Sequence, residues 1–282
     1  MKRFVNIVSG MAAAALAAGG LVPTASAQGD RSIPPQATYA DLADLADSAP
    51  LVVRAKIKRQ AEVEAERAPG LQAGFTRLYV EAETVSLLAG NVPIGGSLRY
   101  LVDVPRDDRG RAPKLKKQEV ILFARPVPNR PGELQLAEPR AQLPWSEATE
   151  QRLRPVLAGL HAADALPAVT GIRDALSVAG NLAGESETQV FLLTQDDSPL
   201  ALTVVRRPGM APVWGFSRSE IVDQSVLAPR PDTIAWYRLA CFLPPSLPAG
   251  ANLATDSAAQ QQAVVDYLFV LSELGPCPRN RN

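Results

Sequence analysis

Few side chains in this sequence are of the types that catalyse reactions or bind metals. His161 is the only histidine, and histidine is the usual general base near neutral pH and a frequent metal ligand. It lies at the end of a predicted helix, where a cationic ring interacts favourably with the last turn, so we interpret it as a capping residue. A zinc site needs several such ligands, and the sequence has neither a second histidine nor a cysteine cluster. We therefore expect no metal and no cofactor.

Two carboxylates, Glu185 and Glu187, lie in a glycine-flanked polar turn. Paired carboxylates can act as general acid and base, which raises the hypothesis of a hydrolase of unrecognised type. On a polar turn such residues are more often simply solvated, and catalysis also needs a cleft. A serine nucleophile elbow would need Gly-x-Ser-x-Gly, but Ser217 has a glycine only on its amino-terminal side. The simpler interpretation is a protein without catalytic activity.

The most distinctive charged stretch contains six basic and two acidic residues within twelve positions. It lies between two predicted strands, so we expect an exposed loop that could contact an anionic partner. An ordinary solvated loop is the competing interpretation. The basic residues are Arg106, Arg109, Arg111, Lys114, Lys116 and Lys117. Over the whole chain, 29 basic residues balance 29 acidic ones, which argues against nucleic-acid binding.

The first residues have the three parts of a secretory signal peptide. A basic start, Met1-Lys2-Arg3, is followed by a mostly apolar run and then by Ala25-Ser26-Ala27. We predict cleavage between Ala27 and Gln28. A membrane anchor is the alternative, because the run approaches the length of a span. The small-residue site favours cleavage, so we expect a periplasmic or secreted protein with no membrane span after cleavage.

The chain has two cysteines, Cys241 and Cys277. In an exported protein, an even number of cysteines usually indicates a disulfide. The residues between two predicted helices, 243–255, are numerous enough to bring the two positions together. Two buried thiols remain the alternative.

The first half of the chain has the pattern of an antiparallel β-domain. A short helix is predicted over 38–47, and a helix from Ser146 toward His161 that Pro155 should kink or restart. Five predicted strands lie between them without an intervening helix, which is typical of a small barrel or sandwich. Side-chain parity switches within 75–88, which indicates a bulge. The strands are predicted over 51–58, 75–88, 97–104, 120–123 and 134–136.

Three segments of this half resemble a known family. They are Ala49–Val53, the stretch from Tyr79 to Gly90, and Val120–Ala124. Together they are similar to the OB-like barrel of netrin and tissue-inhibitor-of-metalloproteinase domains. The inhibitors of that family act through an amino-terminal cysteine, and their barrels carry disulfides. This half has no cysteine, so the resemblance implies the barrel and not the inhibitory mechanism.

The second half has a different organisation. Strands are predicted over 189–194, 200–206 and 212–216, and helices over 219–224, 232–242 and 256–274. Residues 170–179 fit a helix or a strand by periodicity, and the neighbouring glycines favour a strand. Two segments, 184–189 and 236–241, resemble exported bacterial proteins, a likeness that implies no activity.

The resulting prediction is an α+β fold in two domains after a signal peptide over 1–27. An OB-like β-barrel with flanking helices covers 28–161, and an antiparallel meander packed with C-terminal helices covers 168–282. We expect an exported, non-catalytic binding or interaction protein. Its partner would be another envelope protein or an anionic envelope component. The alternatives are a carboxylate hydrolase, and an envelope-associated protein that contacts anionic glycolipid through its basic loop.

Overall fold

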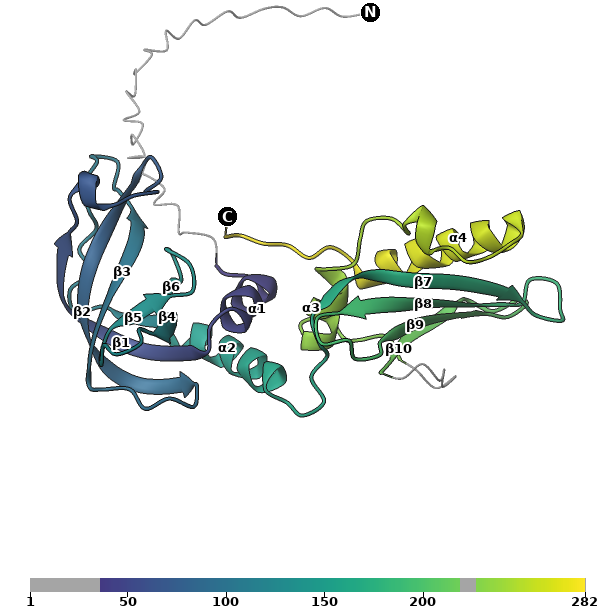
Figure 1. Cartoon of the computed structure of the whole chain (residues 1–282), viewed down its shortest axis with the longest axis horizontal. Coiled ribbons are helices and arrows are strands. Elements are labelled where there is room, and N and C mark those ends of the chain that lie inside the picture. The colour runs from purple at the N-terminus through teal and green to yellow at the C-terminus, as the bar shows by residue number, and fades with distance from the viewer. Residues whose placement is uncertain (1–35, 219–226, 282) are drawn as a thin grey trace, which may run out of the picture. The chain divides into compact units, whose positions relative to one another are not determined.

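Antiparallel sheets and helices make up the part of the chain that a computed structural model describes, residues 36–218 and 227–281 (Figure 1). The predicted α+β class is therefore confirmed. The predicted signal peptide with its cleavage site at Ala27 and Gln28, and the helix predicted over 219–224, lie outside the described residues.

Helix α1 (Tyr39–Asp47), which was predicted over 38–47, begins with a capping box. The Thr38 hydroxyl accepts a hydrogen bond from the Asp41 amide at 3.0 Å, and the Asp41 carboxylate accepts one from the Thr38 amide at 2.8 Å. These bonds satisfy two of the amides that an α-helix leaves unpaired at its start. Leu42 and Leu45 are buried in the core.

The first sheet has the order β3-β2-β1-β4-β5, with β6 also paired to β4. Strand β4 is buried on both faces from Val120 to Ala124, a continuous apolar run. The register between β1 and β2 shifts at three places, which confirms the predicted bulge. The strands are β1 (Leu51–Glu62), β2 (Phe75–Ala89), β3 (Ser97–Pro105), β4 (Glu119–Pro126), β5 (Leu134–Leu136) and β6 (Gln142–Pro144).

This sheet does not close into the predicted barrel. An isolated parallel bridge joins Arg99 of β3 to Glu133, and the Arg99 amide donates to the Gly132 carbonyl at 2.8 Å. The bridge does not extend into a ladder with β5, which has only three residues. On the other side of the bridge, Pro131 lacks the amide hydrogen that a longer ladder would need.

Helix α2 (Glu147–Leu160) runs continuously through Pro155, so the expected restart is absent. Leu153 and Val156 are buried, and the helix packs against α1. His161 is the C-cap residue, and its backbone amide donates to the Leu157 carbonyl. The cap is thus made by the backbone, and the imidazole is exposed.

The second sheet is a simple meander, β10-β9-β8-β7. Residues 170–179 lie in a strand, which settles the open assignment. Short 3-10 turns occur at Ala65–Arg67 and at Ala249–Ala251. The elements of this half are β7 (Val169–Ala179), β8 (Ser186–Thr194), β9 (Ala201–Arg206), β10 (Val213–Ser217), α3 (Ile234–Ala240) and α4 (Ser257–Leu274).

Helix α4 packs on one face of this sheet, beside β7 and β8 (Figure 1). Its residues Ala263, Tyr267 and Val270 are buried there. Residues Gln36–Asn282 form one compact unit. The predicted domain boundary at 162–167 stays a prediction.

Candidate functional site

The alternation of side chains along the second sheet divides it into two faces. Thr188 and Val190 of β8 face α4 and are buried, whereas Glu187 and Gln189 point to the opposite face and are half-buried. Among the described residues, no helix packs on that opposite face. A binding surface on this sheet would therefore use the second set of side chains.

Strand pairing places Val178, Glu187, Val205 and Val213 in one row across the four strands. The two hairpin turns at 180–185 and 207–212 lie just beyond this row, at the same end of the sheet. We call the side chains gathered here the apolar end of the second sheet. It consists of Val178, Leu182, Val205, Met210 and Val213.

The apolar end is unusually exposed for aliphatic side chains. Leu182 is 63% exposed, Met210 62%, Val178 57% and Val213 55%. Single exposed apolar residues are normal on a protein surface, but a contiguous group marks a surface that contacts another molecule.

Two hollows lie beside the apolar end. One of about 410 Å³ is lined by Val178, Glu187 and Arg207 among others, and a smaller one of about 70 Å³ by Met210 and Val213. Arg207 and Val205 line both. Arg207 is exposed and forms no ion pair with another described residue. The surface therefore combines aliphatic contact area with one cation and two carboxylates, those of Glu185 and Glu187.

The structure brings both predicted carboxylates, Glu185 and Glu187, to the larger hollow. The Glu185 carboxylate accepts a hydrogen bond from the Leu182 amide at 3.2 Å and so stabilises the turn. The Glu187 carboxylate accepts one from the Gln189 side chain at 3.0 Å. The two carboxylates thus have separate partners, and their use in catalysis stays a prediction.

Two of the six basic residues of the loop are neutralised by acidic neighbours. Arg106 pairs with Glu62, which also accepts a hydrogen bond from the Thr76 hydroxyl at 2.7 Å. These hydrogen bonds, that from Thr76 foremost, lower the pKa of Glu62. Arg111 pairs with Asp107 at 2.9 Å.

The remaining four basic side chains are exposed and form no ion pair with another described residue. They are Arg109, Lys114, Lys116 and Lys117. The loop is held against β1, because the Lys117 amide donates to the Ile57 carbonyl at 2.8 Å and the Leu115 amide to the Gln60 side chain at 2.6 Å. The predicted exposed basic loop is present, with fewer unpaired charges than the sequence suggested.

Sequence reasoning missed the role of three aspartates in α1. Asp41, Asp44 and Asp47 are spaced by three. Asp44 accepts a hydrogen bond from the Tyr237 hydroxyl, and Asp47 binds both terminal nitrogens of Arg238, each at 2.7 Å. Burial raises the pKa of Tyr237, and Asp44 adds to the effect. The repeated spacing was the available signal, because positions three apart share one side of a helix.

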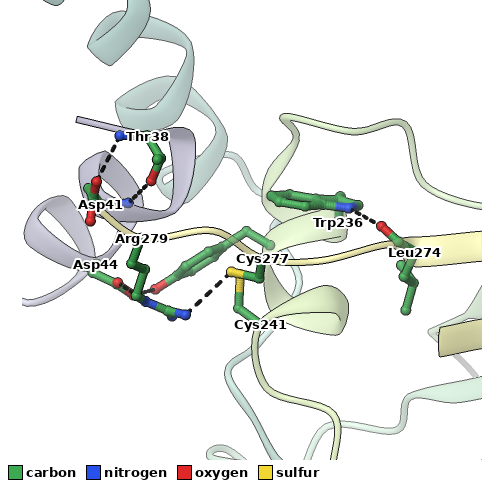
Figure 2. Close-up of a disulfide and its surroundings, with 9 residues drawn as sticks. Thr38, Asp41, Asp44, Trp236, Cys241, Leu274, Cys277 and Arg279 are labelled. Carbon is green, nitrogen blue, oxygen red and sulfur yellow. Dashed lines mark hydrogen bonds and ion pairs between the residues drawn. A yellow bond between two sulfur atoms is a disulfide. The ribbon is translucent and has the colours of Figure 1, made fainter. Parts of the chain in front are cut away.

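The predicted disulfide between Cys241 and Cys277 is present (Figure 2). Within the described residues, no three His, Cys, Asp or Glu side chains are placed to hold a metal ion. No described helix is long and apolar enough to cross a membrane.

Comparison of the chain with protein-family models gives no match, and comparison with curated proteins gives none either. The resemblance to netrin-like domains therefore rests on the sequence segments alone.

Proposed function

We propose that this chain is an exported, non-catalytic binding protein that contacts a protein partner through the apolar end of the second sheet. The observation that carries the proposal is the exposure of four aliphatic side chains, each more than half accessible, at one end of this sheet. Burying them against a partner would remove apolar surface from water, which is the main driving force of protein association.

The polar residues beside the apolar end favour a protein over a lipid surface as partner. Arg207 and Glu187 carry opposite charges and line the same hollow. Such a mixed pair can be matched by complementary charges on a protein, which gives specificity more than affinity. An anionic membrane would be attracted by Arg207 and repelled by Glu187.

Export to the periplasm or the medium is part of the proposal. The amino-terminal pattern ending at Ala27 supports it. The disulfide is consistent with it, because such bonds persist in oxidising compartments.

We also propose that the first sheet is an OB-like barrel left incompletely closed. An OB-like barrel would bring its third strand beside its fifth, in parallel. The order β3-β2-β1-β4-β5 and the parallel bridge between Arg99 and Glu133 support this assignment.

The experiment places a photo-crosslinking residue at Val213 in the exported protein. We expect irradiation in cells to yield one discrete protein adduct. Val178→Asp should abolish that adduct, because it places a charge within the apolar surface, in the same row of the sheet as Val213. Leu268→Asp is the matched control, since it puts the same charge on an exposed aliphatic position of α4 and should leave the adduct unchanged. Failure to form an adduct, or an adduct insensitive to Val178→Asp, would reject this function.

A second candidate function rests on the four basic side chains without a described ion pair. Through them the loop would contact anionic glycolipid of the envelope. Vesicles containing such a lipid should bind the protein at low salt and release it as salt screens the charges. Lys114→Ala with Lys116→Ala should weaken binding, whereas salt-insensitive binding would contradict this function.

The hydrolase hypothesis is retained because Glu185 and Glu187 line one hollow. It predicts turnover by the purified protein in a broad panel of hydrolase substrates, and loss of that turnover in Glu187→Gln. If the unmodified protein turns over none of the substrates in the panel, the hydrolase hypothesis is rejected.

A further inference from the structure

The C-terminal segment Gly275–Arg281, which we call the strap, follows α4 and runs to α1 (Figure 2). Arg279 donates to both carboxylate oxygens of Asp44, at 2.6 and 3.2 Å. The backbone amides of Asn280 and Arg281 donate to the Asp41 carboxylate at 3.0 and 3.2 Å. The strap therefore covers two of the three aspartates on α1.

Further contacts extend the strap along the first half of the chain. The Asn280 side chain donates to the Gln36 carbonyl at 2.8 Å. The Arg281 guanidinium binds Glu138 at 3.0 Å and the Arg140 carbonyl at 2.7 Å. Residues more than 140 positions apart in the chain are joined by these bonds.

The disulfide fixes the strap at its middle. Cys277 is bonded to Cys241, the residue that caps α3, and both cysteines are partly exposed. The start of the strap is fixed separately, because the Trp236 indole donates to the Leu274 carbonyl at 2.8 Å. Arg279 connects the bridge to α1, since it also donates to the Cys277 sulfur at 3.4 Å.

The ion pair that docks Arg279 on α1 is exposed to solvent. The side chains of the pair formed by Arg279 and Asp44 are 35% and 36% exposed. Exposed ion pairs contribute little to stability, while each residue that becomes ordered loses backbone entropy. The disulfide offsets this loss by keeping Arg279 close to Asp44.

We propose that the bridge between Cys241 and Cys277 is a thiol-sensitive latch that holds the strap on α1. A dithiol reductant opens the latch, the strap leaves α1, and the carboxylates of Asp41 and Asp44 become accessible.

The exchange proceeds in two steps. One thiolate of the reductant attacks the Cys241 sulfur, a sulfur–sulfur bond forms there, and the electron pair of the broken bond leaves on Cys277. The Arg279 guanidinium stabilises the resulting Cys277 thiolate, which makes this sulfur the better leaving group. The second thiolate of the reductant then attacks the reductant sulfur that is bonded to Cys241, and the Cys241 sulfur leaves as a thiolate. The dithiol is oxidised to its disulfide, and both cysteines take up a proton from solvent when they become thiols.

Limited trypsin digestion tests the latch in the full protein. The oxidised protein is compared with protein that has been reduced, alkylated and freed of reductant. We expect cleavage after Arg279 to be at least about tenfold faster in the reduced form, because proteolysis follows the population of the open state. Equal cleavage rates in the two forms would overturn the proposal.

Cleavage at two other sites distinguishes release of the strap from unfolding of the whole protein. Arg109 lies in the exposed loop and should be cleaved equally fast in both forms. Arg77 lies in β2, paired with Asp103, and should stay protected in both. If reduction also exposes Arg77, the bridge holds the fold as a whole and the latch is wrong.

A variant tests docking without touching the cysteines. Asp44→Asn keeps an acceptor for Tyr237 but removes the charge that binds Arg279. We expect faster cleavage after Arg279 in this oxidised variant, with no free thiols. Unchanged protection would show that α1 does not hold the strap.

The direction of exchange is tested with a monothiol. Brief exposure to glutathione, followed by acid quenching and peptide mapping, should place the first mixed disulfide on Cys241. A first adduct mainly on Cys277 would contradict the role assigned to Arg279.

Discussion

At the scale of single residues, charged side chains near Trp145 form one interacting cluster. The Arg54 guanidinium stacks 3.6 Å from the centre of the Trp145 ring and pairs with Glu119 at 2.6 Å. Trp145 in turn donates its indole hydrogen to Glu150 at 2.7 Å. Trp145 therefore belongs to a charged cluster.

The first prediction concerns the titration of Glu150. The hydrogen bond from Trp145, followed by that from Arg154, lowers the pKa of Glu150 below its ordinary value of 4.5. A group with a depressed pKa in the folded state stabilises the protein above its unfolded pKa. That stabilisation is lost as the pH falls through the folded pKa. The NMR signal of the Trp145 indole hydrogen should therefore titrate with a midpoint below 4.5.

Two variants check this assignment. Glu150→Gln should remove the titration from the Trp145 signal, and Trp145→Phe should raise the pKa of the Glu150 carboxyl toward its ordinary value. A midpoint at or above 4.5 in the unmodified protein would contradict the prediction.

At the scale of elements, a buried polar cluster joins α4 to the second sheet. Asp266 of α4 is fully buried and accepts hydrogen bonds from Thr188 of β8 and Arg206 of β9. The hydroxyl groups of Ser177 and Thr188 lie 2.9 Å apart. The Thr188 hydroxyl has a single hydrogen, which it donates to the Asp266 carboxylate. Ser177 is therefore the donor in the hydrogen bond between the two hydroxyls. Pairing a helix to a sheet in this way specifies which face of α4 is buried.

We predict that Asp266→Ala lowers the free energy of unfolding by about 2–4 kcal/mol, because it leaves Arg206 and Thr188 without their acceptor. Asp266→Asn should cost less, since its amide oxygen still accepts one bond. Urea denaturation measures both. Glu273→Ala, at an exposed position of α4, is the control and should change stability by less than about 0.5 kcal/mol. Equal losses in Asp266→Ala and Glu273→Ala would show that the cluster is not stabilising.

The approach of β3 to the segment before β5 depends on a glycine. Gly132 has a φ of +79°, and a Cβ added there would lie 2.8 Å from the Ser97 carbonyl oxygen. Alanine is strained in this conformation and also collides with backbone. The absence of a side chain is what permits the bridge between Arg99 and Glu133.

Gly132→Ala should therefore weaken the bridge locally. We expect faster hydrogen exchange at the Arg99 amide, which donates to Gly132, and a loss of about 1–3 kcal/mol in the free energy of unfolding. Gly110→Ala, at a positive φ with open space around it, controls for backbone strain without collision. If both variants leave the Arg99 exchange rate unchanged, the collision is not significant.

At the scale of the whole molecule, α1 binds residues far away in the chain. Asp44 contacts Tyr237, and Asp47 contacts Arg238, whose side chain is only 8% exposed. The bidentate geometry between Asp47 and Arg238 is the strongest form of such a contact. Removing Asp47 would leave a nearly buried guanidinium without its counter-ion.

We predict that Asp47→Ala destabilises the protein by about 1–3 kcal/mol. Arg238→Ala should cost a similar amount, and the double variant should cost less than the two losses combined, because the pair is removed together. Urea denaturation of the four proteins gives the coupling energy. Asp108→Ala, in the exposed loop, is the matched control. Additive losses would mean that the two side chains do not stabilise each other.

Much of the local structure was predictable because it depends on neighbouring residues. The capping residue Thr38, the strand predicted over 120–123 and the strand predicted over 189–194 follow from periodicity and hydrogen bonding within a few positions. The continuous helix across Pro155 was not predictable in this way, because packing of Leu153 and Val156 compensates for one lost backbone bond.

The features of the candidate site also differ in whether local sequence could predict them. The sequence by itself determined that Cys241 and Cys277 can be joined and that the loop beginning at Arg106 is basic. It predicted a turn for both Glu185 and Glu187, which is wrong for Glu187, because that residue lies in β8. Only the tertiary structure decided that Glu185 stabilises its own turn, that Val178 and Val213 lie in one exposed row, and that the aspartates of α1 bind the strap. The physical reason is the distance along the chain between the residues that interact. A turn or a cap is determined by residues a few positions apart, whereas the partner of an aspartate or the exposed face of a strand depends on which distant segment packs against it.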